Sequence, residues 1–367
     1  MSEVDLTLPE GVLTFLEGTP FSSDNVVKLT GGLGNYVFRL HLKTPYHEHT
    51  TLVLKHGKPH LPGDETFTFD LERQAFEVGV LKRIREWLPD DSLVTVPAIH
   101  HFDEVANIII MDDCGGVGTL KQLMIDNPPP LVMAQQIGEA LGKWLACLHS
   151  WGSSDKDALA YVNGNQQARS IAAFVTYGRL VSTLKGENAP PSMTDPVLDI
   201  PAGHIATVEK VVQEMTQEIM TTEETLVMGD FWPGNIIVVF SDDRSAVQRL
   251  YVLDWEIVRP GIAGLDVGQF LAEMHLLRSF RPHCAESSTA VISSFQTAYA
   301  KTRGGPMELV AKKAMIHVGA HLVAWTPLAG WGGKEKTREV VLHGVGYLVG
   351  DASKEETHAI VGNLTSR

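Results

Sequence analysis

The sequence has few of the features that mark secreted, membrane or nucleic-acid-binding proteins. Only three of its 367 residues are cysteines and no CxxC pair occurs, so neither a disulfide framework nor a structural zinc site is expected. Apolar runs stay shorter than about 18 residues, and residues 1–10 lack a basic and apolar leader, so we expect a cytoplasmic protein without a membrane partner. The formal charge of −14 argues against a nucleic-acid partner, which would need a basic face.

Two common catalytic signatures are also missing. No GxSxG string occurs, so a serine nucleophile on a strand-to-helix elbow has no support. The nearest approach to the phosphate-binding pattern GxxxxGK[ST] is residues 138–143, which has one residue too few and is followed by Trp144. The sequence therefore disfavours both of these enzyme classes.

Length and hydrophobic pattern predict two lobes of different kind. A chain of 367 residues is more naturally divided than built on one core. Residues 1–112 form the first expected lobe. We predict one long helix in it at residues 65–87. Strands are predicted at residues 26–29, 36–42, 51–55, 94–102 and 107–111. The glycines at 115 and 116 allow a change of direction, and residues 113–367 form the second lobe. The fold class expected is α+β, with an antiparallel sheet and a helix before a larger helical lobe.

The second lobe carries several segments of helical period with short strands between them. The helices are expected at residues 131–151, 205–221, 266–280, 287–301 and 308–325. The strands are expected at residues 226–227, 236–239 and 250–253. The segment Gly229 to Asn235 therefore lies between two of these short strands.

Three glycines stand between the first two predicted strands. Backbone N–H groups in such a loop can approach an anionic phosphate closely, which makes Gly32, Gly34 and Asn35 candidates for nucleotide binding. An ordinary glycine-rich hairpin turn is the alternative, and the loop alone favours it. Val37 also stands where the third glycine of a GxGxxG pattern would be.

Lys55 ends the third predicted strand. Such a lysine commonly extends to solvent, but here it follows a glycine turn and precedes a long helix, so it can bridge the phosphates of a nucleotide. Glu77 on that helix is the expected ion-pair partner, because it lies among the apolar positions. Glu72 is the competitor, about 140° around the helix.

The segment Gly229-Asp230-Phe231-Trp232-Pro233-Gly234-Asn235 is the most informative motif. Asp230 is of the right type to accept the proton of a substrate hydroxyl, and Asn235 and Asp254 to hold Mg²⁺ on the phosphates of ATP. Glu256 would share a face with Asp254 if that segment is extended, which makes it a further metal or water ligand. Any one of these residues alone is as well explained as a solvated loop residue.

Together these motifs resemble a known superfamily over nearly the whole chain. The series Gly31 to Arg39, Leu54-Lys55, Gly229 to Asn235 and Asp254-Trp255-Glu256 is similar to the aminoglycoside phosphotransferase and choline kinase superfamily, which has a protein-kinase-like fold of two lobes. Within it the chain resembles 5-methylthioribose kinases, and more closely the fungal 4-hydroxytryptamine kinases. The closer likeness is carried by Leu54-Lys55-His56, Glu224 to Met228, Leu253 to Glu256 and His321 to Thr326.

The resemblance implies roles for further residues. Residues 111–114 would be the hinge that meets adenine through its backbone, with Met111 and Asp113 as contacts. Asp266 would be the structural aspartate that accepts hydrogen bonds from the catalytic loop. Met228 departs from the superfamily, which usually has histidine before Gly-Asp; the usual role there is mainly packing, so we expect activity to be retained.

Candidate walls of an acceptor pocket are few. Trp232 lies in the catalytic-looking loop, and Trp325 and Trp331 lie near the C-terminal helices. His317 and His321 are four residues apart and share a helix face. For each of these residues, packing in the core or hydrogen bonding is the stronger explanation.

The sequence therefore predicts an ATP- and Mg²⁺-dependent kinase for a small molecule. A protein substrate is disfavoured because only eleven residues separate Asp254 from Asp266, too few for a long activation loop. The expected acceptor is the hydroxyl of an amine-bearing aromatic, then a thioribose-like sugar, then an aminoglycoside. The alternative from another class is a catalytically silent nucleotide-binding module. Oligomeric state is not readable from the sequence.

Overall fold

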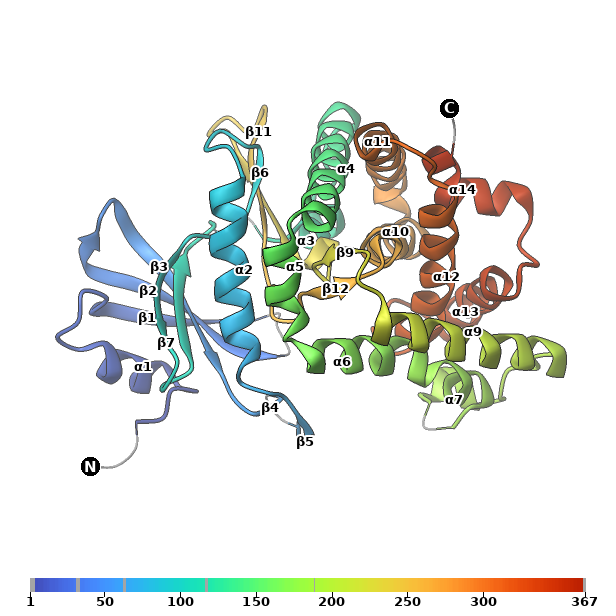
Figure 1. The fold of residues 1–367 in the computed structure, drawn as a ribbon, viewed down its shortest axis with the longest axis horizontal. Coiled ribbons are helices and arrows are strands. Elements are labelled where there is room, and N and C mark those ends of the chain that lie inside the picture. The colour runs from blue at the N-terminus through green and yellow to red at the C-terminus, as the bar shows by residue number, and fades with distance from the viewer. Residues whose placement is uncertain (1–3, 31–33, 62–63, 116–117, 188, 366–367) are drawn as a thin grey trace. The chain divides into compact units, whose positions relative to one another are not determined.

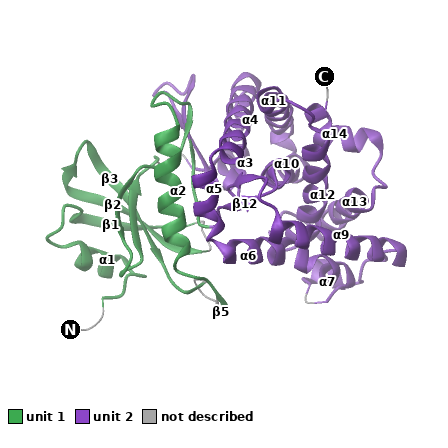
Figure 2. Ribbon diagram, viewed as in Figure 1, with its two compact units in different colours: residues 1–116, 251–256 green, residues 117–250, 257–367 purple. Residues whose placement is uncertain are grey.

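The computed structural model describes residues 4–30, 34–61, 64–115, 118–187 and 189–365 (Figure 1). The chain divides into two compact units (Figure 2). Unit 1 comprises residues 1–116 and 251–256, and unit 2 comprises residues 117–250 and 257–367. The short segment 251–256 thus belongs to unit 1, although it follows more than a hundred residues of unit 2.

Unit 1 is built on a five-stranded antiparallel sheet. Its strands stand in the order β1 (Ser23–Leu29), β2 (Asn35–Tyr46), β3 (His49–Gly57), β8 (Ile108–Asp112) and β7 (Ile99–Asp103). Leu52 and Leu54 point to the face covered by α1 (Pro9–Leu16), whereas Val53 packs with Val78 of α2 (Arg73–Trp87) on the other face (Figure 1). Because side chains alternate along a strand, Lys55 shares the α2 face with Val53.

The strands and the helix expected in this unit are present, with two differences. The helix begins at Arg73 and not at residue 65, because residues 64–68 form β5 (Asp64–Thr68), which pairs with β4 (His60–Leu61). The run Thr66-Phe67-Thr68 is β-branched and aromatic, a composition that favours extended backbone. The expected strand 94–102 is split into β6 (Val94–Thr95) and β7, because Pro97 has no N–H to donate.

Unit 2 is mainly helical. Its helices are α3 (Leu120–Asp126), α4 (Leu131–Ser154), α5 (Lys156–Asn163), α6 (Gln166–Thr176), α7 (Leu180–Lys185), α8 (Pro191–Thr194), α9 (Ala202–Thr221), α10 (Ala263–Phe280), α11 (Ala285–Arg303), α12 (Glu308–Trp325), α13 (Lys334–Val349) and α14 (Lys354–Thr365). All five helices expected here are present. A buried cluster of apolar side chains from α6, α7, α9, α10, α12 and α13 forms a large part of the core.

Helices α4 and α11 pack side by side at close range (Figure 1). A side chain at Gly138 would overlap the carbonyl oxygen of Val291, and one at Gly142 would overlap that of Phe295. These are the two glycines of the string that approaches the phosphate-binding pattern. Their place in the helix shows that they serve backbone packing and not a phosphate loop.

Short strands frame the candidate loop of unit 2. The loop follows β9 (Thr225–Val227) and leads through a 3₁₀ turn at Pro233–Asn235 into β10 (Ile236–Phe240) and then β11 (Val247–Val252). Strand β9 pairs with β12 (Arg259–Gly261) in antiparallel register. The three strands expected from the sequence here are confirmed. None of the helices among the described residues is long and apolar enough to cross a membrane.

The sheet core of unit 1 gives a direct test of the fold. Leu40 on β2 is fully buried, so Leu40→Ala should lower the free energy of unfolding by about 2–5 kcal/mol through lost burial and the cavity left behind. Val105 is 94% exposed, so Val105→Ala should change it by less than about 0.5 kcal/mol. Urea unfolding followed by tryptophan fluorescence measures both; equal midpoints for the two variants would contradict this core assignment.

Candidate functional site

The centre of the candidate site in unit 1 is the buried ammonium of Lys55. Its Nζ lies 2.8 and 2.9 Å from the two carboxylate oxygens of Glu77, and it also bonds Asp254 Oδ1. Glu256 Oε2 is 3.9 Å away. The predicted ion pair between Lys55 and Glu77 is therefore confirmed, and Glu72 has no part in it, since it is exposed at the start of α2.

A second cation, Arg73, closes the other side of this cluster. Its Nε donates to Glu256 Oε2 at 2.9 Å, and its Nη2 donates to Asn35 Oδ1 at 3.2 Å and to the carbonyl of Gly34 at 3.1 Å. Asn35 Nδ2 in turn donates to Glu256 Oε2 at 2.8 Å. A side chain at Gly34 would overlap Glu256 Oε1, whereas the other oxygen of that carboxylate is held by Arg73 and Asn35. The end of the glycine loop is thus tied to Glu256.

The electrostatics of the cluster follow from burial and from two cations facing three carboxylates. Burial opposes the charged ammonium, but Asp254, Glu77 and Glu256 outweigh it and raise the pKa of Lys55. Burial raises the pKa of Glu77 despite the neighbouring ammonium. Burial also acts to raise the pKa of Glu256, but the positive charges of Lys55 and Arg73 outweigh it, and the pKa of Glu256 is lowered. Lys55 is therefore a fixed positive charge in a site that excludes much of the solvent.

Asp254 has an unusual backbone. Its φ is +68°, in the left-handed region that residues other than glycine rarely adopt, so the expectation of an extended segment from Asp254 to Glu256 is wrong. The two carboxylates still come together, because the backbone turns at Asp254. Carboxylate oxygens of Glu77, Asp254 and Glu256 lie within 4.8 Å of one another. Oxygen donors at this spacing fit a hard cation such as Mg²⁺.

Two further nucleotide-binding candidates of unit 1, Met111 and Asp113, lie on and directly after β8. Gly32 lies outside the described residues. Met111 is buried on β8, where its partners across the ladder are Val53 and Ile99. Asp113 follows that strand, and its carboxylate accepts hydrogen bonds from Arg39 Nε at 2.6 Å and Nη2 at 2.9 Å.

In unit 2, the carboxylate of Asp230 is held from two directions. Asn235 Nδ2 donates to Asp230 Oδ2 at 2.8 Å, and Gln269 Nε2 donates to Asp230 Oδ1 at 2.6 Å. Because the amide nitrogen of Asn235 is used in this way, its carbonyl oxygen is the atom suited to a cation. The structure thus brings Asp230 and Asn235 together as their spacing predicts.

Asp266, near the start of α10, fixes the backbone at the beginning of this loop. Its carboxylate accepts from the N–H groups of Met228 at 2.8 Å and Gly229 at 2.9 Å, as the sequence predicts. His149 Nε2 lies 3.3 Å from the same carboxylate and its Nδ1 lies 2.8 Å from the hydroxyl of Tyr299. Met228 is fully buried, which fits the packing role expected for it.

Two glycines of the loop are required by its geometry. Gly229 has φ +87°, and a side chain there would overlap the guanidinium of Arg259. A side chain at Gly234 would overlap the indole of Trp232, which folds back over its own loop. The motif is therefore a packed unit, and not only a set of chemical groups.

Trp232 belongs to an aromatic and charged cluster in unit 2. The ammonium of Lys121 lies 4.7 Å from the ring centre of Trp232 and 4.3 Å from that of Trp331, and 3.1 Å from Glu273 Oε2. The indole N–H groups of both tryptophans are buried, and neither has a hydrogen-bond partner among the described residues. Such donors call for a polar partner.

The cluster continues through Glu273 to the histidines of α12. His321 Nε2 lies 2.9 Å from Glu273 Oε1, and its ring stacks on Trp325. His317 lies 2.9 Å from the hydroxyl of Tyr177, and burial lowers the pKa of His317 to about 3. Both histidines are thus hydrogen-bonded packing residues, as the sequence favours.

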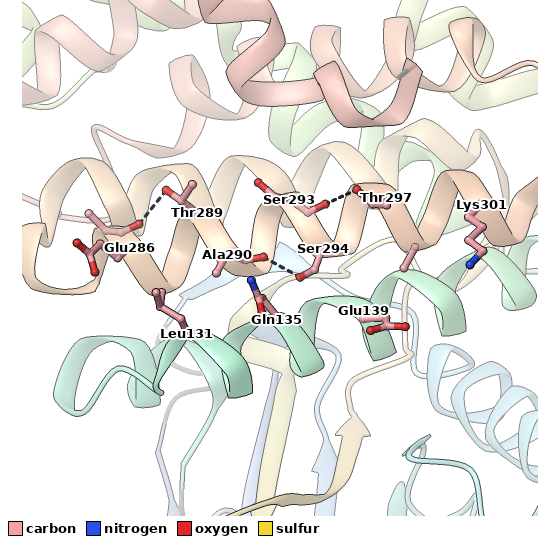
Figure 3. A pocket seen from close by; sticks show the side chains of 12 residues that line it. Leu131, Gln135, Glu139, Glu286, Thr289, Ala290, Ser293, Ser294, Thr297 and Lys301 are labelled. Carbon is pink, nitrogen blue, oxygen red and sulfur yellow. Dashed lines mark hydrogen bonds between the residues drawn. The ribbon is translucent and has the colours of Figure 1, made fainter. Parts of the chain in front are cut away.

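A groove of unit 2 lies away from the candidate residues. It has a volume of about 950 Å³ and is lined by residues of α4 and α11, among them Gln135, Glu139 and Ser294 (Figure 3). Figure 3 shows these side chains along two neighbouring helices, and none of the candidate residues lines the groove. This groove is therefore not the candidate site.

Sequence reasoning missed several residues that hold the site. Arg73 donates to Glu256, and Gln269 donates to Asp230. Lys121 contacts both tryptophans and pairs with Glu273. Only Gln269 left a usable signal, since it lies three residues after Asp266 and therefore on the same side of α10. The others are contacts between segments that are far apart in the sequence.

Known proteins resemble the chain along almost its full length. The 4-hydroxytryptamine kinase of Psilocybe cyanescens is 33% identical over 351 residues, which cover 93% of this chain and 92% of that protein. The 4-hydroxytryptamine kinase of Psilocybe cubensis is 31% identical, with the same coverage. A methylthioribose kinase of Bacillus cereus is 23% identical over 66% of this chain and 58% of its own. No family model matches.

Two solved structures share the fold. A choline/ethanolamine kinase family protein from Mesorhizobium loti has a TM-score of 0.53 at 13% identity and covers 97% of this chain and 98% of its own. An aminoglycoside 2'-phosphotransferase-IIIa has a TM-score of 0.52 at 12% identity, with 95% and 97% covered. The α+β, protein-kinase-like fold expected from the sequence is confirmed by these two.

Arg73 offers a test of the cluster in unit 1. Arg73→Ala would leave the buried carboxylate of Glu256 with one cation fewer, so it should lower the free energy of unfolding by about 3–5 kcal/mol. Arg73→Lys keeps the charge but not the planar fork, and a smaller loss is expected. Chemical denaturation measures both, and equal losses for the two variants would show that the charge beside Glu256 has no stabilising part.

Proposed function

The chain belongs to the family of the 4-hydroxytryptamine kinases, and from this premise we propose that it phosphorylates the hydroxyl of a 4-hydroxytryptamine-like aromatic amine with ATP. The observation that carries the choice of acceptor is 33% identity over 93% of the chain to a 4-hydroxytryptamine kinase. The domain assignment from the sequence forms part of this proposal. Residues 1–112 bind the nucleotide, and residues 113–367 carry the catalytic loop and the acceptor pocket.

On the nucleotide side, Lys55 is the cation that meets the α- and β-phosphates. Its three carboxylate partners keep it charged and oriented before ATP arrives, so little reorganisation is needed. Gly32, Gly34 and Asn35 bring the glycine loop to the phosphates. Met111 and Asp113 belong to the segment that meets adenine through backbone groups.

Mg²⁺ is the cofactor that the oxygen donors suit. We assign Asp254 to it, with Glu256 as a further ligand or as a ligand to bound water. Asn235 is assigned to it from the sequence motif. When bound, the ion offsets the negative charge of the phosphates during transfer. Asp254 is suited to this role because its carboxylate is one-third exposed, whereas that of Glu77 is buried.

Asp230 is the group that accepts the proton of the acceptor hydroxyl. Hydrogen bonds from Asn235 and Gln269 hold its carboxylate in one orientation. A fixed carboxylate can align the acceptor hydroxyl for attack as well as accept its proton. Asp266 holds the backbone in front of it through Met228 and Gly229. Loss of this alignment would slow phosphoryl transfer but would not prevent ATP from binding.

The acceptor pocket is proposed to include Trp232, with Trp325 further along the same cluster. Trp232 supplies an aromatic face two residues from Asp230, and the buried N–H groups of Trp232 and Trp331 are donors that a polar group of the acceptor would satisfy. The net charge of −14 suits a cationic acceptor. A thioribose-like sugar ranks second and an aminoglycoside third.

A catalytically silent module is the weaker alternative. Met228 and the incomplete glycine pattern motivate it, but Met228 is a buried packing residue. Burying the charged groups around Lys55 costs desolvation free energy. A protein that only binds a nucleotide would have no need of these ion pairs together with an Asp230 carboxylate held by hydrogen bonds.

An ATP-consumption assay over a panel of hydroxylated indole amines, thioribose and aminoglycosides tests the proposal. We expect turnover to be highest with the indole amine, and Asp230→Asn to reduce kcat by at least about a hundredfold while Kd for ATP changes little. Asp242→Asn, an exposed aspartate of the same unit, is the matched control and should behave as the wild type. Tight ATP binding with no turnover on any acceptor would favour the silent module.

Trp232 allows the acceptor side to be tested separately. Trp232→Ala should raise KM for the aromatic amine by about tenfold and leave KM for ATP nearly unchanged, because the aromatic face is lost. Trp232→Phe keeps an aromatic ring and should recover most of the affinity. Steady-state kinetics with each substrate varied in turn measures this; a change confined to KM for ATP would remove Trp232 from the acceptor pocket.

A further inference from the structure

A second group of metal-binding side chains lies in unit 1, apart from the Lys55 cluster. It consists of His49 on β3, His100 on β7 and Asp112 on β8. These strands are neighbours in the order β3, β8, β7, so Asp112 on the central strand has one histidine on each side. Residues that are up to 63 positions apart in the sequence therefore meet on one sheet.

The two imidazoles converge on the same carboxylate oxygen. His100 Nε2 lies 2.8 Å and His49 Nε2 lies 3.8 Å from Asp112 Oδ1. Ligand atoms of the three residues all lie within 4.8 Å of one another. In a tetrahedral site with metal–ligand distances near 2.0–2.2 Å, ligand atoms are separated by about 3.3–3.6 Å. The two distances to Asp112 Oδ1, 2.8 and 3.8 Å, bracket that value, so small side-chain shifts bring these ligand atoms to it.

The surroundings of the three residues suit a bound ion. The other oxygen of Asp112 accepts a hydrogen bond from the N–H of Ala98 at 2.8 Å, which orients the carboxylate as in many metal centres. The ring of Tyr46 meets that of His100 edge-on at 5.5 Å and limits its rotation. The side chain of His49 is 40% exposed, against 13% and 15% for His100 and Asp112, which leaves a path from solvent.

We propose that His49, His100 and Asp112 form a binding site for a divalent transition metal such as Zn²⁺. Two neutral imidazoles and a carboxylate are a donor set that Zn²⁺, Co²⁺ and Ni²⁺ prefer, whereas Mg²⁺ prefers oxygen donors alone. The site would link three adjacent strands and leave one coordination position to water. It is independent of the proposed kinase chemistry, whose oxygen donors are Asp254, Asn235 and Glu256.

Calorimetric titration of untagged, chelator-treated protein with Zn²⁺ in excess Mg²⁺ tests the site, because Mg²⁺ fills oxygen-only positions and leaves imidazole ligands free. We expect one Zn²⁺ per chain. His49→Ala and His100→Ala should each weaken Zn²⁺ binding by at least about tenfold. Loss of a residue that only hydrogen-bonds a metal ligand already lowers metal affinity by about that factor. Asp112→Asn removes the charge at nearly constant volume and should have the same effect. Co²⁺ titration should give the visible absorption of a low-coordinate imidazole site in the wild type and not in these three variants.

The matched control is His204, which forms an exposed pair with Asp351 at 3.1 Å in unit 2. His204→Ala removes an imidazole beside a carboxylate but not the proposed site, so it should keep wild-type affinity. Circular dichroism and thermal unfolding without metal show whether each variant is folded. Absence of stoichiometric Zn²⁺ binding by the wild type, or unchanged binding by both His49→Ala and His100→Ala, would overturn the proposal.

Discussion

The buried ammonium of Lys55 is the constraint on which the arrangement of unit 1 depends. A lysine removed from water is tolerated only if carboxylates compensate for its lost hydration, and Glu77 and Asp254 do so directly. A third buried carboxylate near the ammonium, that of Glu256, is balanced by a second cation, Arg73. The last residues of the glycine loop, Gly34 and Asn35, are fixed by the same contacts. One buried charge thus organises a strand, a helix, a loop and the returning segment 251–256.

In unit 2, a buried charge is stabilised by hydrogen bonds and not, among the described residues, by ion pairs with lysine or arginine. Asp266 is buried and accepts from two backbone N–H groups, so its charge is balanced and the loop before Asp230 is fixed at once. Asp230 itself is held by Asn235 and Gln269. In both units the residue with a chemical role is oriented by a partner on another element. Orientation of this kind lowers the reorganisation needed during phosphoryl transfer.

The sequence predicted the candidate residues better than it predicted their neighbours. The pair Lys55 and Glu77 could be predicted because the strand and helix periods place both side chains inward. The pair Asp230 and Asn235 could be predicted because they are only five positions apart in a tight loop. Arg73 could not be found in this way, since its partners lie up to 183 residues away and nothing local distinguishes it from a surface arginine. The helix start was wrong by eight residues because residues 64–68 pair as a strand.

The order of residues by itself determined the fold class, the strands and helices that carry the motifs, and the kind of chemistry, because hydrophobic period and side-chain type are local properties. Tertiary structure alone decided which charges neutralise one another. It brought Glu256 to Arg73, set Lys121 between two tryptophans, and gathered His49, His100 and Asp112 on one sheet. The physical reason is that such contacts depend on strand order and on a left-handed turn at Asp254, which no spacing in the chain records.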